Sequence, residues 1–361
     1  MIERLRIERL RVIRHADIPF DHGIHWFHGP NGSGKTTIIE AIHLLSTGRT
    51  FTGKAELDPL IQDGQAGMSI RLDHSEHGGF TLHKARGEDK RLTRNTQDTM
   101  KQNEIARLLP LVTVHAQSHL LIDGPAVVRR RYLDWGLFHV DEAFVQQSQH
   151  YARLLKQRNA SLRQGLPDRL VRSWDELLGE AGERLKAYRE NHLQTLKPYI
   201  DQCQQALLPE REVGITLRPG WSRQAAHLTS ALADNLEQDR LRGYTGVGAH
   251  RAELAIQVDR KPARERLSRG EKRRLALTLR LAQLLWYANL KGHPPVCLLD
   301  DFGMELDESG GRTVLELIER SGAQTLVTTT EHLFHTYLPH TPVNTVFHVK
   351  HGEVQIHRSS R

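Results

Sequence analysis

The sequence has little cysteine and no long apolar run. Its only two cysteines, Cys203 and Cys297, lie far apart without a Cys-x-x-Cys spacing, which excludes a disulfide framework and a cysteine-based zinc site. No apolar run approaches the roughly 20 residues that a membrane-spanning helix needs. The first 15 residues alternate charged with apolar side chains, unlike a signal peptide. We therefore expect a cytoplasmic protein that is neither exported nor membrane-spanning.

The composition is that of a globular protein. Hydrophobic residues make up 38% of the 361 residues and charged residues 26%, which excludes large-scale disorder. At roughly 150 residues per domain, this length predicts two domains or one large α/β domain with an insertion. The formal net charge of +7 favours a polyanionic partner, although many other soluble proteins carry a similar charge.

The first and last thirds of the chain have the pattern of an α/β domain. Helices are expected from about residue 35 to a cap at Gly48, over 271–289, and after Asp307. Strands are expected within 1–28, at 68–72, 80–82, 111–114, 254–258, 296–299 and 325–327, and in a hairpin of 346–349 with 354–356.

The middle of the chain, residues 125–241, has apolar residues at helical spacing. Pro167, Pro198, Pro209 and Pro219 interrupt it too often for a sustained heptad seam, which argues against a long coiled coil. We expect a head formed by residues 1–120 and 243–361, with a mixed sheet and flanking helices, and a helical insertion lobe formed by residues 121–242.

A phosphate-binding loop is the strongest motif. The segment GPNGSGKT matches G-x-x-x-x-G-K-[ST] and lies after a predicted strand and before a predicted helix. Its glycines allow backbone amides to approach phosphates, Lys35 reaches the β- and γ-phosphates, and the Thr36 hydroxyl ligates Mg²⁺. The expected nucleotide-binding residues of this loop are Gly29, Pro30, Asn31, Gly32, Ser33, Gly34, Lys35, Thr36 and Thr37.

Two acidic residues follow the apolar strand at 296–299. Asp300 is expected to ligate Mg²⁺ with Thr36, because ligands of α/β sheets bind at the carboxyl ends of strands. Asp301 lies where a general base or water-orienting carboxylate is needed for attack on the γ-phosphate. By itself this pattern is equally that of an ordinary strand end; the phosphate-binding loop makes it a candidate site.

The segment LSRGEK at 267–272 lies directly before the helix predicted to end at residue 289. Ser268 and Gly270 in such a turn can direct a hydroxyl and backbone amides toward an anion. The alternative is a capping box, because Glu271 follows Ser268 by three residues.

This order of motifs resembles the ABC-type ATPase head, and the long stretch between Lys35 and Ser268 exceeds the spacing in transporter ATPases. Four further segments resemble the RecF family of bacterial recombination mediators: RRYLDWG from Arg130, LKQRNA from Leu155, GAHRAEL from Gly248, and LDD from Leu299 followed by Glu305-Leu306-Asp307. The chain departs from the family pattern at Ala249, Ala252, Glu253 and Met304.

The resemblance implies a weak, DNA-stimulated ATPase that uses ATP and Mg²⁺. ATP would drive homodimerisation, with each nucleotide between the phosphate-binding loop of one subunit and the signature turn, LSRGE, of the other. The family binds gapped or junction DNA and, with RecR and RecO, helps to load the recombinase RecA. Gln117 would take the place of the glutamine that reaches Mg²⁺ and the attacking water, whereas a surface glutamine is the alternative.

A DNA-binding surface is expected on basic residues of the insertion lobe: Arg129, Arg130, Arg131, Arg153 and Lys156. A solvated surface or packing within the lobe is the alternative. Because no aromatic residues alternate with these charges, we expect contact with phosphates and little sequence specificity. Two other functions stay open: a nucleotide-gated DNA tether with weak hydrolysis, and a transporter ATPase subunit.

Histidines are numerous but give no clear site. His332 lies near the position of a switch histidine, although Thr329 and Thr330 are closer to the end of the preceding strand. His22, His25 and His28 suggest a metal site, but positions 25 and 28 fall on opposite faces of a strand.

Overall fold

The chain forms two compact units in the computed structural model, which describes residues 1–95, 98–222, 224–304, 306–337, 339 and 343–357. Unit 1 consists of Met1–Ser118, Gln205–Leu208 and Arg273–Arg361, and unit 2 of His119–Gln204 and Pro209–Lys272. None of the helices in the described part of the chain is long and apolar enough to cross a bilayer.

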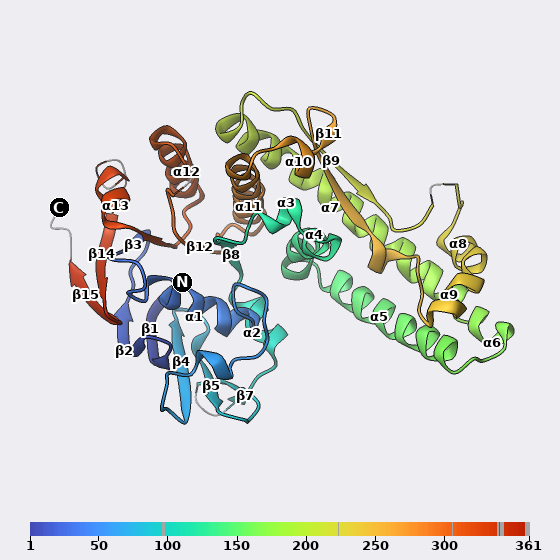
Figure 1. Ribbon diagram of the computed structural model, residues 1–361, viewed down its shortest axis with the longest axis horizontal. Helices are drawn as coiled ribbons and strands as arrows, with labels where there is room; N and C mark the ends of the chain where they lie inside the picture. Colours follow the sequence, from blue (N-terminus) through green and yellow to red (C-terminus); the bar gives the residue numbers. More distant parts are fainter. Residues whose placement is uncertain (96–97, 223, 305, 338, 340–342, 358–361) are drawn as a thin grey trace. The chain divides into compact units, whose positions relative to one another are not determined.

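Unit 1 contains two sheets that enclose helix α1 (Figure 1). One is mixed, with the order β15-β14-β3-β13-β12-β8, in which all strands but β15 run parallel. The other is antiparallel, with the order β2-β1-β4-β5-β6-β7. The mixed sheet comprises β3 (Ile24–His28), β8 (Leu111–Val114), β12 (Val296–Leu299), β13 (Thr325–Thr329), β14 (Val343–Lys350) and β15 (Glu353–His357). The antiparallel sheet comprises β1 (Ile2–Leu10), β2 (Ile13–Pro19), β4 (Gly67–His74), β5 (Gly78–Ala85), β6 (Arg91–Arg94) and β7 (Asp98–Thr99).

The helices of unit 1 follow the expected α/β pattern. They are α1 (Lys35–Thr47), α2 (Gln102–Leu108), α12 (Glu308–Ser321), α13 (Glu331–Tyr337) and most of α11 (Arg269–Lys291), with a 3₁₀ turn at Asp58–Leu60. Gly48 caps α1 at φ 68°, and Asp307 caps α12 by accepting from the amide of Gly310. The Gly48 cap and a helix after Asp307 were predicted from the sequence.

The central strand of the mixed sheet is buried on both faces. All five residues of β3 are buried, as is usual for a parallel strand with neighbours on each side and layers above and below. Phe27 stacks on Phe347 of β14 with ring centroids 4.6 Å apart, while Trp26 packs edge-on against Phe302 and Phe334. This packing fixes the position at which β3 ends and the phosphate-binding loop begins.

Unit 2 is mainly helical and carries a small antiparallel sheet in the order β11-β10-β9. Its strands are β9 (Val213–Arg218), β10 (Glu253–Val258) and β11 (Lys261–Pro262). Its helices are α3 (Leu120–Asp123), α4 (Ala126–Val140), α5 (Glu142–Arg163), α6 (Asp168–Arg172), α7 (Asp175–Leu207), α8 (Leu228–Asp234), α9 (Leu236–Arg242) and α10 (Ala263–Arg266), with a 3₁₀ turn at Ala249–Arg251.

The second boundary between the units differs from the one expected from the sequence. Residues 243–272 were expected in the head, but they belong to unit 2. The reason is that β10 pairs with β9, with Leu254 opposite Leu217, and β9 lies in the segment for which a helical lobe and no strand was expected. Strand β9 has alternating burial, but Gly214 and the neighbouring helical pattern obscured it in the sequence.

Pro198 does not break its helix. It lies inside α7, which continues for 33 residues although proline removes one backbone hydrogen bond. The expectation that this proline interrupts the helix was therefore wrong. Helix α7 packs in its own unit against α5 and α8 through a cluster that includes Tyr151, Leu178, Leu185 and Leu228. The predicted fold class, an ABC-type head with a mainly helical second lobe and no long coiled coil, is confirmed.

Candidate functional site

Four parallel strands of unit 1 end at one edge of the mixed sheet. The phosphate-binding loop follows β3, Thr328 lies near the end of β13, Asp300 follows β12 and Gln117 follows β8 by three residues (Figure 1). Adjacent parallel strands bring their carboxyl ends together, as α/β sheets do at their ligand sites. The structure thus gathers the phosphate-binding loop, both candidate carboxylates and Gln117 at this edge.

The phosphate-binding loop needs glycine at two positions for different reasons. Gly34 is the N-cap of α1 and has φ 113°, a conformation that L side chains rarely adopt. A Cβ on Gly29 would lie 2.1 Å from the carbonyl oxygen of Val349 in β14. The loop is also joined to the hairpin turn after β14, where the amide of Gly352 donates to the carbonyl of Ser33 at 2.9 Å.

Lys35 folds back onto the loop that it follows. Its ammonium donates to the carbonyls of Gly29 and Pro30, both at 2.8 Å, and the residue is only 5% exposed. Burial lowers the pKa of Lys35, while the negative charges of Asp301 and Asp300 oppose that shift. Because helix α1 begins at this lysine, its first-turn amides have no acceptor within the helix and can face an anion.

Asp300 connects the two halves of the site. Its Oδ1 accepts hydrogen bonds from the hydroxyls of Thr36 at 2.9 Å and of Thr328 at 2.7 Å. Burial raises the pKa of Asp300 to about 6, the hydroxyl of Thr328 opposes this shift, and the charge of Asp301 adds to it. A carboxylate and a hydroxyl in direct contact are the hard oxygen ligands that Mg²⁺ prefers, so Thr36 and Asp300 fit that ion.

Thr328 is the site residue that sequence analysis missed. Its hydroxyl donates to Asp300 and also accepts from the amide of Asp301 at 2.9 Å. It therefore fixes both acidic residues from the neighbouring strand. A threonine in a buried strand gives little signal alone; the run of Thr328, Thr329 and Thr330 at a parallel strand end was the available sign.

Asp301 has a left-handed backbone, with φ 53°, which is uncommon for a residue other than glycine. It lines a cavity of about 270 Å³ in unit 1 together with Asp300, Phe302, Arg273 and Met304. Gln117 lies half-exposed in the turn after β8, and its backbone amide donates to Nδ1 of His115 at 3.3 Å. Both residues therefore lie at this edge of the mixed sheet.

The predicted signature turn lies in unit 2 and is a capping box. The hydroxyl and the amide of Ser268 both donate to Oε2 of Glu271, at 2.7 and 3.0 Å. Arg211 also binds this carboxylate, with its Nε 3.1 Å from Oε1. These hydrogen bonds, first from Ser268 and then from Arg211, lower the pKa of Glu271 to about 2. Ser268 and Gly270 lie at the start of α11, with the Ser268 hydroxyl donated to Glu271.

The predicted DNA-binding residues differ in their surroundings. The guanidinium of Arg129 is 12% exposed; it pairs with both oxygens of Glu253 and donates to the carbonyl of Gly124 at 2.8 Å. Arg130 donates to the carbonyl of Ala252 at 2.8 Å. These two side chains thus pack within unit 2, the alternative left open by the sequence. Exposed side chains are found at the other three predicted positions, Arg131, Arg153 and Lys156.

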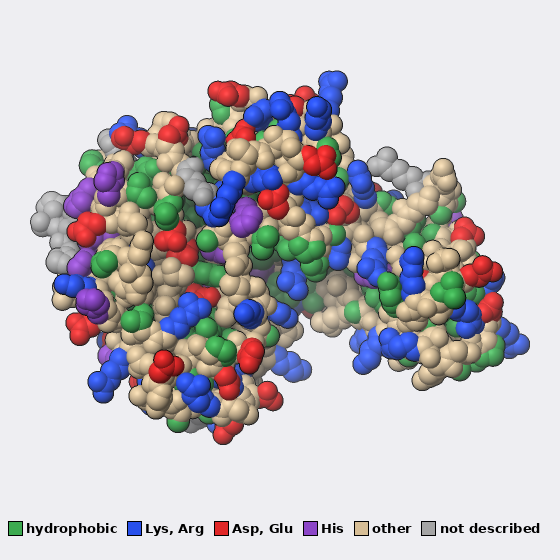
Figure 2. All heavy atoms as spheres, viewed as in Figure 1, with side chains coloured by type: hydrophobic (Ala, Val, Ile, Leu, Met, Phe, Trp, Pro, Cys, Tyr) green, Lys and Arg blue, Asp and Glu red, His purple; other side chains and the backbone are tan. Residues whose placement is uncertain are grey.

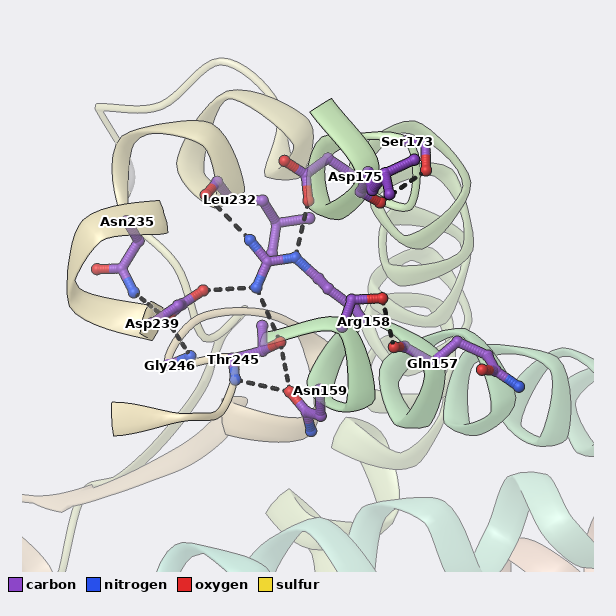
Figure 3. A network of polar contacts seen from close by, with 12 residues as sticks. Gln157, Arg158, Asn159, Ser173, Asp175, Leu232, Asn235, Asp239, Thr245 and Gly246 are labelled. Atoms are coloured by element: carbon purple, nitrogen blue, oxygen red, sulfur yellow. Dashed lines mark hydrogen bonds and ion pairs between the residues drawn. The ribbon is translucent and has the colours of Figure 1, made fainter. Parts of the chain in front are cut away.

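Arg158, two positions beyond Lys156, is buried at the centre of a polar network (Figure 3). It is 0% exposed and binds Asp175 at 2.7 Å and Asp239 at 2.6 Å. It also donates to the hydroxyl of Thr245 at 2.9 Å. Arg158 therefore joins α5 to the start of α7 and to α9, and it holds unit 2 together.

The departures from the family pattern have structural counterparts. Glu253 supplies the carboxylate for Arg129, and Met304 is 61% exposed beside the cavity near Asp301. Glu305, which completes the predicted Glu-Leu-Asp segment, lies outside the described residues.

Two histidines of the N-terminal cluster, His25 and His28, pack against aromatic rings. The ring of His25 packs against Phe20, while His28 stacks on Phe334 with centroids 4.4 Å apart. Within the described part of the chain, one group has three potential ligand atoms within 4.8 Å of one another, and it combines His28 with Glu331 and His348. His332 is exposed in the first turn of α13.

Known proteins resemble the chain along its whole length. The family model described as RecF/RecN/SMC N terminal domain matches residues 1–355. The chain is 38% identical to the DNA replication and repair protein RecF of Thioalkalivibrio sulfidiphilus (strain HL-EbGR7), over 99% of both chains. It is also 38% identical to the RecF protein of Stenotrophomonas maltophilia (strain R551-3), over 91% of this chain and 93% of the relative.

Solved structures share the fold. A structure of the recombination mediator protein RecF with ATP, from the RecFOR pathway, has a TM-score of 0.83 at 24% identity and covers 99% of this chain and 97% of its own. An Smc head bound to the C-winged helix domain of ScpA has a TM-score of 0.60 at 16% identity and covers 99% of this chain and 98% of its own.

Proposed function

Because the chain belongs to the RecF family, we propose that it is an ATP-dependent recombination mediator that binds DNA during repair and replication. Its reaction would be the hydrolysis of Mg²⁺-bound ATP, weak by itself and stimulated by DNA. Its partners would be gapped or junction DNA, RecR and RecO, and its outcome the loading of RecA. Membership of the RecF family argues against the alternative that the chain is a transporter ATPase subunit.

The contact between Thr36 and Asp300 carries most of the support for ATP chemistry. It joins the phosphate-binding loop to a buried acidic strand end, two motifs that lie far apart in the sequence. In this proposal the loop from Gly29 to Thr37 wraps the phosphates and Lys35 contacts the β- and γ-phosphates. Thr36 and Asp300 hold Mg²⁺, which would neutralise phosphate charge when bound. Asp301 and Gln117 orient the attacking water.

The signature turn would act across a dimer. Ser268 and Gly270 of one subunit would contact the γ-phosphate of the ATP held by the other. To do so, the Ser268 hydroxyl must exchange its acceptor Glu271 for a phosphate oxygen. Exposed Arg131, Arg153 and Lys156 would contact DNA phosphates, whereas Arg129 and Arg130 would support the lobe from within.

Mixing two inactive variants tests the shared site. Lys35→Ala and Ser268→Arg should each abolish hydrolysis when every subunit carries the change. In a mixed dimer, Lys35 of the Ser268→Arg subunit faces the intact Ser268 of its partner, which gives one complete site of two. With random pairing, about a quarter of wild-type turnover should return if the sites act independently.

Each variant measured alone at the same total concentration is the control, and ATP-dependent crosslinking reports dimer formation in parallel. If the mixture neither hydrolyses ATP nor forms more dimer than either variant alone, the shared site is wrong. Single-turnover measurements with and without DNA separate the mediator from a DNA tether that binds ATP but barely hydrolyses it, an alternative suggested by the short side chain of Asp301.

A further inference from the structure

We propose that the segment leading into the signature turn forms a second contact surface for the phosphate backbone of DNA, apart from Arg131, Arg153 and Lys156. This basic segment comprises residues 260–269, of which the last three are the first three of the signature turn, and it contains five exposed cations: Arg260, Lys261, Arg264, Arg266 and Arg269. The inference rests on the proposed DNA-binding function. The sequence motifs did not indicate that this part of the surface contacts DNA.

A tight hairpin presents the first two cations. Val258 of β10 pairs with Lys261 of β11, which leaves only Asp259 and Arg260 in the turn. Both turn residues have positive φ, 51° and 64°, as a type I′ turn requires. Residues with side chains adopt this conformation at a cost that glycine avoids, and such strain is concentrated at functional sites. The hairpin therefore carries two adjacent exposed cations, Arg260 in the turn and Lys261 at the start of β11.

Two carboxylates at this hairpin are paired with arginines. Asp259 pairs with Arg211 at 2.9 Å and with Arg266 at 3.3 Å. Glu265 pairs with Arg264 at 3.2 Å. The positive charges of these arginines compensate the two carboxylates, which would otherwise repel a polyanion.

Three cations of the segment remain unpaired. In the described part of the chain, no carboxylate lies within 4.0 Å of the charged group of Arg260, Lys261 or Arg269. Arg129 differs, because its guanidinium is paired with the carboxylate of Glu253. Figure 2 shows Lys and Arg side chains gathered over the region where Figure 1 places β11 and α10.

The chemistry of the surface indicates which ligand it takes. Unpaired Lys and Arg bind phosphates and release counterions from nucleic acid. The segment contains no aromatic residue on which a base could stack, so it would contact the backbone without reading sequence. A DNA strand is therefore the ligand that its charge and composition fit.

The position of the segment ties this contact to the nucleotide. After the hairpin, α10 is followed by Leu267, which is 6% exposed and whose amide donates to the carbonyl of Ala263 at 3.1 Å. Ser268 comes next. Few residues, fixed by burial and hydrogen bonds, thus separate the hairpin from the signature serine. DNA bound at Arg260 and Lys261 would influence the turn that is proposed to contact ATP in the dimer.

The test compares two double variants of the full chain. Arg260→Ala with Lys261→Ala removes two unpaired cations. Arg184→Ala with Lys186→Ala is the matched control, because it removes the same charge from α7, where Glu180 and Glu190 lie within ion-pair distance of those cations. Fluorescence anisotropy of a labelled duplex with a single-stranded overhang measures affinity between about 50 and 200 mM salt, with a non-hydrolysable ATP analogue present.

The hairpin variant should bind DNA more weakly, and its log–log salt slope should decrease in magnitude by about two. Between the lowest and the highest salt concentration, the fold-loss of affinity should be roughly tenfold smaller for the hairpin variant than for wild type. The control should keep the wild-type slope. Binding of a fluorescent ATP analogue and the melting temperature should stay unchanged in both, because Arg260, Lys261 and Arg184 are exposed and Lys186 is partly exposed.

A hairpin variant with the wild-type slope would overturn this inference and leave the proposed function intact. If wild type itself fails to bind DNA, or binds only vesicles of anionic lipid, the proposed function fails and the inference with it. Equal slope changes in both double variants would also overturn it, since they would show that overall charge rather than this surface is responsible.

Discussion

Replacing Arg158 with methionine should destabilise unit 2 severely. The change leaves Asp175 and Asp239 buried, at 4% and 0% exposure, without the cation between them. Removing one member of a buried ion pair costs about 3–5 kcal/mol, because the remaining charge is neither solvated nor paired. The free energy of unfolding should therefore fall by about that amount, a large fraction of the stability of an ordinary domain.

Arg153→Met is the matched control, because Arg153 lies on the same helix with its side chain exposed. It should change the unfolding free energy by less than about 0.5 kcal/mol. Arg158→Lys should be intermediate, since lysine keeps the charge but cannot span Asp175, Asp239 and Thr245 with one planar group. Urea unfolding followed by far-ultraviolet circular dichroism measures all three variants.

The pH dependence of the stability lost in Arg158→Met provides a second test of this prediction. Burial raises the pKa of Asp175 even in the intact network, where Arg158 opposes the shift. Without Arg158 the pKa in the folded variant rises further, so protonation on acidification favours its folded form. The deficit relative to wild type should therefore shrink between pH 7 and pH 5. A deficit below about 1 kcal/mol, or one that is equal at both pH values, would refute this account of the network.

Two further predictions concern charges that the sequence placed at functional sites. Arg129→Gln should lower the unfolding free energy by roughly 1–3 kcal/mol, because Glu253 and the Gly124 carbonyl lose their donor. It should leave the salt slope of DNA binding unchanged. Arg131→Gln should instead reduce the magnitude of that slope by about one. A reduced salt slope in the Arg129 variant would indicate that Arg129 contacts DNA and would contradict this prediction. The hydrogen bonds that lower the pKa of Glu271 to about 2 add stability that is present above its ordinary pKa of 4.5 and lost as the pH falls toward 2. The stability difference between wild type and Glu271→Gln should thus shrink between pH 5 and pH 3 in thermal melts, and an unchanged difference would contradict it.

Local patterns predicted much of the nucleotide site. The phosphate-binding loop, the helix after it and the acidic end of β12 are contiguous motifs whose residue types are dictated by their own backbone. The terminal hairpin could also be predicted, because alternation and the His351-Gly352 turn fix its register, with Val349 opposite Val354.

Pairings between distant segments could not be predicted. Arg158 and Lys156 look alike in the sequence, yet one is buried and the other exposed, and this depends on Asp175 and Asp239 from other helices. Arg129 likewise meets its partner only because α4 packs on β10. Charge runs therefore overstate the surface available to DNA until their partners are known.

The strand order of the mixed sheet has a consequence for how the chain is made. Strand β3 pairs on both sides with C-terminal strands, β13 and β14, and its end at His28 precedes Thr325 of β13 by about 300 residues. At bacterial synthesis rates of roughly 5–20 residues per second, β3 would wait about 15–60 s for its first neighbour. Until then the backbone N–H and C=O groups on both edges of β3 lack their native partners, and the phosphate-binding loop lacks the Gly352 contact. The phosphate-binding loop is therefore among the first segments to be synthesised and among the last to gain its native contacts.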